Sequence, residues 1–204
     1  MRLHVHELSG HSHRTQLFAS LLQLDVEIVR VDLAAGEHKQ PAFLAKNQLG
    51  QVPVLEDGDL TLTDSNAINV YLASRYDETG QWYPDAPEAR ARIQRWLSIA
   101  AGEIKSGPAD ARLVNVFGAK LDHERAKQIA TRVLGLLESE LQKSEFLAGA
   151  GATLADVAVY SYVAHAPEGG VSLAPFPAVR AWLTRVEALA GFIPMKRTAA
   201  GLAA

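Results

Sequence analysis

Apolar and polar residues follow strand and helix periods in turn along the first third of the chain. Residues 3–6 alternate, which predicts a short strand with Leu3 and Val5 on one face. Apolar side chains at helical spacing predict an amphipathic helix over residues 14–24. Residues 27–32 are rich in β-branched side chains and predict a second strand. This order predicts a parallel strand pair joined by a crossover.

The next segments continue the mixture of strands and helices. A short helical piece is expected over residues 41–46. Residues 51–56 and 60–63 predict two strands, and Asp57-Gly58 between them is a hairpin turn signal. Residues 64–66 (Asp-Ser-Asn) then open another helix.

Beyond residue 88 every periodic segment predicts a helix. The expected helices cover residues 89–105, a continuation to 117 after a break at Gly107-Pro108, and residues 123–143, 154–164 and 178–189. Thr153 and Asp156 have the spacing of a capping box. Residues 77–87 contain Gly and Pro and predict a linker, so we expect an α/β domain followed by an all-α domain.

Composition and charge exclude several classes of protein. The 204 residues are 48% hydrophobic and 21% charged, the balance of a globular protein rather than a disordered one. A formal net charge of −3 gives no reason to expect nucleic acid as a partner. The absence of Cys excludes disulfides, thiolate metal sites and a Cys nucleophile. No segment approaches the ~18 apolar residues of a membrane span. The first residues also lack the apolar core of a signal peptide, so a cytoplasmic location without a membrane partner is expected.

Two motifs point to a ligand. A cis Val52–Pro53 bond at a sheet edge would turn the backbone of Val52 outward to pair with a peptide-like ligand, although an ordinary trans proline at a strand start fits equally well. Asp64 and Ser65 before a helix are first a capping signal. In a functional interpretation, Ser65 and the free N–H groups of the helix start bind a carboxylate, while Asp64 accepts from an ammonium group.

The sequence resembles that of the cytosolic glutathione transferase family. The resemblance is carried by residues 47–55 and 57–68, of which the second contains an acidic-Ser-x-Ala-Ile signature, and by the helix signals at residues 153–156 and 177–179. Gly36-Glu37-His38-Lys39 is most similar to a theta/delta-like or related bacterial class. The resemblance implies a thioredoxin-like α/β domain at residues 1–77, an all-α domain at residues 85–204, and a homodimer.

The resemblance also implies roles for individual residues. Glutathione would be the co-substrate, held by the backbone of Val52 beside Pro53, by Asp64 and Ser65 at its γ-glutamyl end, and by residues around its glycyl carboxylate: His38, Lys39 and Gln51. Lys39 fits a solvated surface charge equally well. Three residues of the helical half are candidates for the electrophile pocket: Ile104, Arg112 and Phe117.

The catalytic position departs from the family pattern, because residues 8–14 contain neither Tyr nor Cys. Ser9, His11 and Ser12 remain as candidates to stabilise the thiolate, and Ser12 could instead cap the first helix. Lowering a thiol pKa from about 8.5 by ~2 units requires ~2.7 kcal/mol of preferential stabilisation. A hydroxyl or imidazole donor at the helix N-terminus is a plausible source.

Histidines in the first 13 residues raise a metal hypothesis. His4-x-His6 and His11-x-His13 have spacings that can share an ion, but no carboxylate lies at a recognisable ligand spacing. We therefore expect no metal, with His4 and His6 packed and hydrogen-bonded.

The expected function is conjugation of glutathione to small hydrophobic electrophiles, as in detoxification. A glutathione-dependent disulfide reductase, peroxidase or isomerase is the alternative within the same fold. A non-enzymatic relative that keeps the fold as a binding module is a second alternative, although a retained amino-acid head-group site argues against it.

Overall fold

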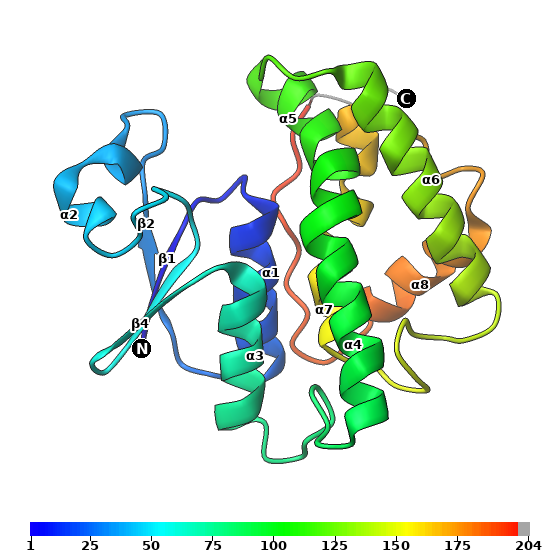
Figure 1. Ribbon diagram of the computed structural model, residues 1–204, viewed down its shortest axis with the longest axis horizontal. Coiled ribbons are helices and arrows are strands. Elements are labelled where there is room, and N and C mark those ends of the chain that lie inside the picture. Colours follow the sequence, from blue (N-terminus) through cyan, green and yellow to red (C-terminus); the bar gives the residue numbers. More distant parts are fainter. Residues whose placement is uncertain (200–204) are drawn as a thin grey trace. The chain divides into compact units, whose positions relative to one another are not determined.

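The computed structural model describes residues 1–199 and divides into two compact units. Unit 1 contains Met1–Glu78 and the late segment Ala190–Lys196, and unit 2 contains Thr79–Leu189 and the residues from Arg197 onward. The α/β and all-α fold classes are thus confirmed in chain order (Figure 1).

Unit 1 is built on a mixed four-stranded sheet with the order β2-β1-β3-β4. The strands are β1 (Arg2–Val5), β2 (Glu27–Arg30), β3 (Val54–Asp57) and β4 (Leu60–Thr63). The predicted parallel pair is β1 with β2, whereas β3 runs antiparallel to both β1 and β4. Leu3 and Val5 are both buried, as the alternation predicted.

Helices cover both faces of this sheet (Figure 1). The helices α1 (Gly10–Leu21) and α3 (Ser65–Tyr76) contact each other on one face. The short helices η1 (Glu37–Lys39) and α2 (Pro41–Leu44) lie on the other, where a buried cluster contains Val31, Phe43 and Val54.

The predicted start of the first helix is wrong by four residues. Its apolar residues begin at Leu17, but α1 already starts at Gly10, because Ser9 is the N-cap and accepts a hydrogen bond from the Ser12 N–H. His11 and Ser12 consequently lie on the first helical turn rather than in a loop.

All the regular elements among the described residues of unit 2 are helices. Its elements are α4 (Pro87–Ile99), η2 (Ala100–Ala109), α5 (Asp110–Phe117), α6 (His123–Leu141), α7 (Leu154–Ala164), η3 (Ala166–Gly169) and α8 (Pro177–Glu187). Residues 154–163 of α7 are all buried, and Asp156 completes the predicted capping box with Thr153. None of the described helices is long and apolar enough to cross a membrane.

The predicted break at Gly107-Pro108 is wrong, because η2 continues through both residues as a π-helical segment. Its wider turn accommodates Pro108, whose nitrogen offers no hydrogen to the helix. Gly107 has a different role: a Cβ there would lie 2.7 Å from the backbone N of Ala130 on α6. The glycine therefore permits a close helix crossing rather than ending a helix.

Within unit 1, the late segment 190–196 contacts α1 and the turn before it through three interactions. Ser20 Oγ donates to the carbonyl of Gly191 (2.7 Å), His13 Nε2 lies 2.9 Å from the carbonyl of Ile193, and Lys196 Nζ lies 2.8 Å from Glu7 Oε1. Only glycine fits at position 191, where φ is +88° and a Cβ would lie 2.8 Å from the Ser20 carbonyl oxygen.

Candidate functional site

The Val52–Pro53 peptide bond is cis, which decides between the two alternatives that the sequence left open. Pro53 is buried and Val52 is half-buried, just before β3 begins. Asn47 holds the preceding turn, since its Nδ2 donates to the Gln51 carbonyl (2.8 Å) and its Oδ1 accepts from Leu49 N–H (3.1 Å). Within residues 1–199, the backbone of Val52 takes part in no hydrogen bond. It is therefore available to pair with a ligand.

The start of α3 lies beside this backbone. In the antiparallel β3–β4 pair the last residues opposite each other are Val54 and Thr63, so Val52 and Ser65 extend from the same end of this strand pair. Asp64 is the N-cap, and its Oδ1 accepts from the N–H groups of Asn66 and Ala67, both at 2.9 Å. The capping interpretation is thus confirmed for Asp64, whose backbone has φ 70° and ψ 122°. Ser65 is the first residue of the helix and is 2% exposed.

Two side chains of α1 reach the hydroxyl of Ser65. Arg14 Nη1 donates to Ser65 Oγ (3.0 Å) and to Asn66 Oδ1 (2.9 Å), and His11 Nδ1 lies 3.3 Å from Ser65 Oγ. Arg14 is 1% exposed. The sequence analysis did not select Arg14, because its position at the start of an amphipathic helix gave no sign that it would be buried.

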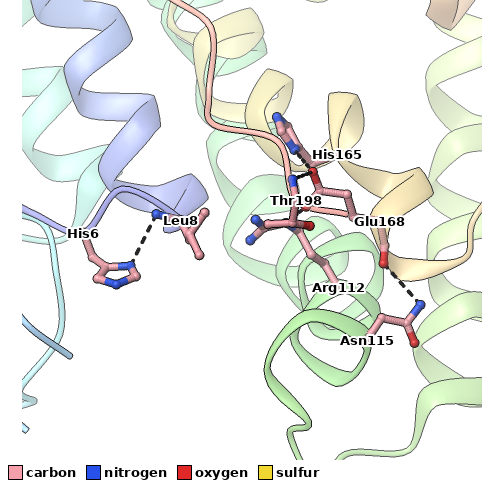
Figure 2. Close-up of polar contacts among 7 residues, drawn as sticks. All are labelled: His6, Leu8, Arg112, Asn115, His165, Glu168 and Thr198. Atoms are coloured by element: carbon pink, nitrogen blue, oxygen red, sulfur yellow. Dashed lines mark hydrogen bonds and ion pairs between the residues drawn. The ribbon is translucent and has the colours of Figure 1, made fainter. Parts of the chain in front are cut away.

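The structure separates the three candidates for thiol activation. Ser9 Oγ accepts from the Ser12 N–H (3.2 Å), so Ser9 rather than Ser12 caps α1. Ser12 is fully buried and its Oγ accepts from the His6 N–H (3.2 Å). In the same turn His6 Nδ1 accepts from the Leu8 N–H (Figure 2). Ser9 and His11 remain half-buried.

The residues predicted for the glycyl carboxylate lie near one another. His38 and Lys39 form most of η1, and the turn that contains Gly50 rests against them. Gly50 has φ +59°, and a Cβ there would lie 2.7 Å from the His38 carbonyl oxygen and 3.0 Å from Lys39 Nζ. Gln51 follows directly and is exposed, as is Lys39.

His4 is packed and hydrogen-bonded, as the sequence favoured. Its Nε2 lies 2.6 Å from Glu56 Oε2, and its ring meets Phe43 edge-on. Lys46 also pairs with Glu56, and the hydrogen bonds from Lys46 and His4 lower the pKa of Glu56 to about 2. Among the described residues, no group of three His, Cys, Asp or Glu side chains is placed to hold a metal ion.

In unit 2, the three pocket candidates lie in different environments. Ile104 is fully buried, whereas Phe117 is 47% exposed. Arg112 is 2% exposed and its Nε donates to Glu168 Oε2 at 2.6 Å. The charge of Arg112 is thus already matched inside the protein, which leaves Phe117 as the candidate with free surface.

Glu168 is the centre of a buried network that the sequence did not predict (Figure 2). Besides Arg112, it accepts from His165 Nδ1 (2.7 Å) and from the Thr198 N–H (3.1 Å). Burial raises its pKa, but the bonds from Thr198, Arg112 and His165 outweigh burial and leave the pKa of Glu168 below its ordinary value. Burial lowers the pKa of His165, so this imidazole is neutral near pH 7.

Comparisons with known proteins agree with the resemblance. The family model for the glutathione S-transferase N-terminal domain matches residues 1–74, and the model for the C-terminal domain matches residues 118–190. Glutathione S-transferase theta-2 of Homo sapiens is 34% identical over 193 residues, covering 90% of this chain and 79% of the relative. Glutathione S-transferase 3 of Zea mays is 36% identical over 180 residues, with 83% and 81% covered.

Solved structures are similar over almost the whole chain. A glutathione S-transferase of Pseudomonas fluorescens superposes with a TM-score of 0.90 at 29% identity, covering 96% of this chain and 98% of that one. Human glutathione transferase theta-2, in complex with glutathione and an unknown ligand, gives a TM-score of 0.85 at 34% identity, with 92% and 81% covered.

Proposed function

The chain belongs to the glutathione S-transferase family and is a glutathione transferase, and we propose that unit 1, with the expected residues 1–77, is its glutathione-binding domain. The helices of unit 2 form its all-helical domain, whose expected range of 85–204 ends outside the described residues. The observation that carries the assignment of the binding site is the free backbone of Val52, which extends from the same end of the β3–β4 pair as Ser65 at the start of α3. The helix start at Ser65 suits a carboxylate, and the backbone of Val52 suits a peptide group. A γ-linked tripeptide carries both.

The tripeptide lies along this edge of unit 1. The backbone of Val52, beside cis Pro53, pairs with the cysteinyl residue. The hydroxyl and the N–H of Ser65 hold the γ-glutamyl carboxylate, while Asp64, whose Oδ1 caps α3, accepts from its ammonium group. At the other end His38, Lys39 and Gln51 meet the glycyl carboxylate, because the turn at Gly50 brings η1 close to Val52.

Ser9 is the residue we assign to the thiolate. Its Oγ already accepts a hydrogen bond as the cap of α1, so its hydroxyl hydrogen remains available to a sulfur anion at the helix N-terminus. Ser12 is less suited because it is fully buried. His11 Nδ1 lies 3.3 Å from Ser65 Oγ, so His11 is the second candidate near the site.

Titration of the ultraviolet absorbance of enzyme-bound thiolate tests this assignment. In the wild-type protein the bound thiol should ionise at least about one pH unit below free glutathione. Ser9→Ala should move the bound pKa back towards the free value, with Ser12→Ala as the matched control that changes it little. A bound pKa equal to that of free thiol in the wild type would overturn thiolate stabilisation by this site.

The chemistry needs no covalent bond to the protein. The thiolate attacks an electrophilic carbon, the leaving group departs with the electron pair, and the protein holds the reactants and limits solvent access. We assign Ile104, Arg112 and Phe117 to the electrophile pocket, where Phe117 offers the exposed aromatic surface. Phe117→Ala should raise KM for an aryl halide while KM for glutathione stays constant. Assaying a small disulfide beside the aryl halide separates conjugation from reductase activity.

We also propose that the enzyme is a cytoplasmic homodimer with a role in detoxification. Leu49 is 70% exposed and Leu60 is 40% exposed, and a second copy of the chain would remove such apolar surface from water. Sedimentation velocity should give twice the mass of the 22.0 kDa chain at micromolar concentration. A monomer under these conditions would contradict the dimer, and cell fractionation tests the location.

A further inference from the structure

The helix α5 presents an exposed apolar face that is held from its buried side. Leu113 is 36% exposed and Phe117, one turn later, is 47% exposed, so both side chains lie on the same face of the helix. The guanidinium carbon of Arg112, a residue that is 2% exposed, lies 5.7 Å from the centroid of the Phe117 ring. This distance is within the range of a cation–π contact. The position of the ring therefore depends on that of a buried guanidinium.

The short helix η3 fixes this guanidinium and the backbone around it (Figure 2). Glu168 Oε2 accepts from Arg112 Nε at 2.6 Å, and the Glu168 carbonyl accepts from Asn115 Nδ2 at 3.2 Å. The next residue, Gly169, lies so close to α5 that a Cβ there would be 2.7 Å from the Arg112 backbone nitrogen. Three contacts to one turn of α5 thus come from two neighbouring residues, Glu168 and Gly169.

The second carboxylate oxygen anchors Glu168 itself. Its Oε1 accepts from His165 Nδ1 (2.7 Å) and from the Thr198 N–H (3.1 Å), and Glu168 is 1% exposed. Each carboxylate oxygen therefore has a donor, which leaves the side chain few alternative positions. Because the carboxylate is fixed, the guanidinium of Arg112 is fixed as well, and so is the Phe117 ring that the guanidinium contacts.

We propose that Glu168 is a positioning residue for the electrophile: through Arg112 it holds the Phe117 ring in the orientation on which an aromatic substrate packs. The proposal rests on the proposed function, in which Phe117 belongs to the electrophile pocket. Two aromatic rings gain from a defined mutual geometry, whereas an aliphatic group lacks this dependence on ring orientation. Loss of the Glu168 carboxylate should therefore reduce the selectivity for aromatic over aliphatic electrophiles and leave glutathione binding unchanged.

Two matched substrates measure this selectivity: benzyl isothiocyanate and propyl isothiocyanate. In both, the thiolate sulfur bonds to the central carbon, and the nitrogen takes the C=N electron pair and a proton. The substrates thus share the reacting group and differ in the aromatic ring. The ratio of their kcat/KM values, measured on one protein sample, is independent of the folded fraction. Glu168→Gln should lower this ratio about threefold through a higher KM for benzyl isothiocyanate, while KM for glutathione stays constant.

Three further variants show whether Glu168 acts through the ring. Phe117→Ala should lower the ratio about fivefold. In that background Glu168→Gln should have no further effect, because the ring through which Glu168 acts is absent. Glu138→Gln is the matched control, since the Glu138 carboxylate accepts from the N–H groups of Ala178 and Val179 at the start of α8 (both 3.0 Å). This control should leave the ratio unchanged.

The double variant Glu168→Gln/Arg112→Met carries the test if Glu168→Gln does not fold, since it leaves no buried charge unmatched and should lower the ratio to the same extent. An unchanged ratio, or an equal loss with and without the Phe117 ring, would overturn the proposal and leave the proposed function intact. An unchanged ratio in Phe117→Ala would remove Phe117 from the pocket and the proposal with it. Failure of the wild type to conjugate glutathione to either substrate would instead overturn the proposed function itself.

Discussion

The two units each bury an arginine, and the surroundings of these arginines differ. In unit 2, Arg112 donates to the carboxylate of Glu168, which His165 and the Thr198 N–H also contact (Figure 2). In unit 1, Nη1 of Arg14 donates to neutral oxygens, the hydroxyl of Ser65 and the amide of Asn66. The first cation contacts an internal carboxylate, whereas Nη1 of the second contacts two neutral oxygens at the start of α3.

This difference predicts that the Arg112–Glu168 pair contributes mainly to stability and that the residues around Ser65 contribute mainly to glutathione binding. A buried ion pair holds segments of the chain together, and breaking it leaves an uncompensated charge. A polar hydroxyl at a helix N-terminus instead favours a bound carboxylate. Substitutions in the Glu168 network should therefore change unfolding, and substitutions around Ser65 should change binding.

The largest change in the free energy of unfolding is expected from Glu168→Gln. The variant keeps the shape but leaves Arg112 buried without its counter-charge, so the free energy of unfolding should fall by about 3–5 kcal/mol. Urea unfolding followed by circular dichroism measures this change. The affinity of the folded fraction for glutathione should stay within about twofold of the wild type. A larger loss of affinity would contradict the division of roles.

Ser65→Ala should give the converse result. Glutathione affinity should fall at least about tenfold, since a hydrogen bond to a charged group is worth ~1.5–3 kcal/mol. The free energy of unfolding should change by only ~1 kcal/mol, because Arg14 keeps its bond to Asn66. Isothermal titration and urea unfolding of the same preparation measure both quantities, and undiminished affinity would refute the role of Ser65.

Combining Glu168→Gln with Arg112→Met sharpens the comparison. The double variant removes both charges, and the glutamine oxygen still accepts from His165 and Thr198. We expect it to recover about 2 kcal/mol relative to Glu168→Gln alone, because no buried charge is left unmatched. Urea midpoints of the wild type, both single variants and the double variant form the cycle. Additive losses would show that the two side chains act independently.

The smallest effect concerns acid stability in unit 1. Glu56 has an ordinary pKa of 4.5, which Lys46 and His4 lower to about 2 in the folded protein. Its contribution is therefore complete above pH 4.5 and is lost as the pH falls through about 2. Glu56→Gln should cost ~1 kcal/mol at pH 6, and less as the pH approaches 2. Urea unfolding between these limits should show a shallower pH dependence in the variant.

Much of the fold was predictable because its signals are local. The alternation at Leu3 and Val5, the hairpin at Asp57-Gly58 and the capping box at Thr153 each depend on residues within a few positions. The predicted break at Gly107-Pro108 failed because the reason for Gly107 is the backbone of Ala130, which belongs to another helix.

The sequence by itself determined the order of elements, the candidate residues Val52 and Ser65, and the family to which they point. Only the tertiary structure decided which groups the buried arginines contact, because Arg14 and Ser65 are separated by 51 positions and Arg112 and Glu168 by 56. Capping and periodicity act between neighbours in the chain, whereas the free energy of a buried charge depends on whichever groups the fold brings within a few ångströms.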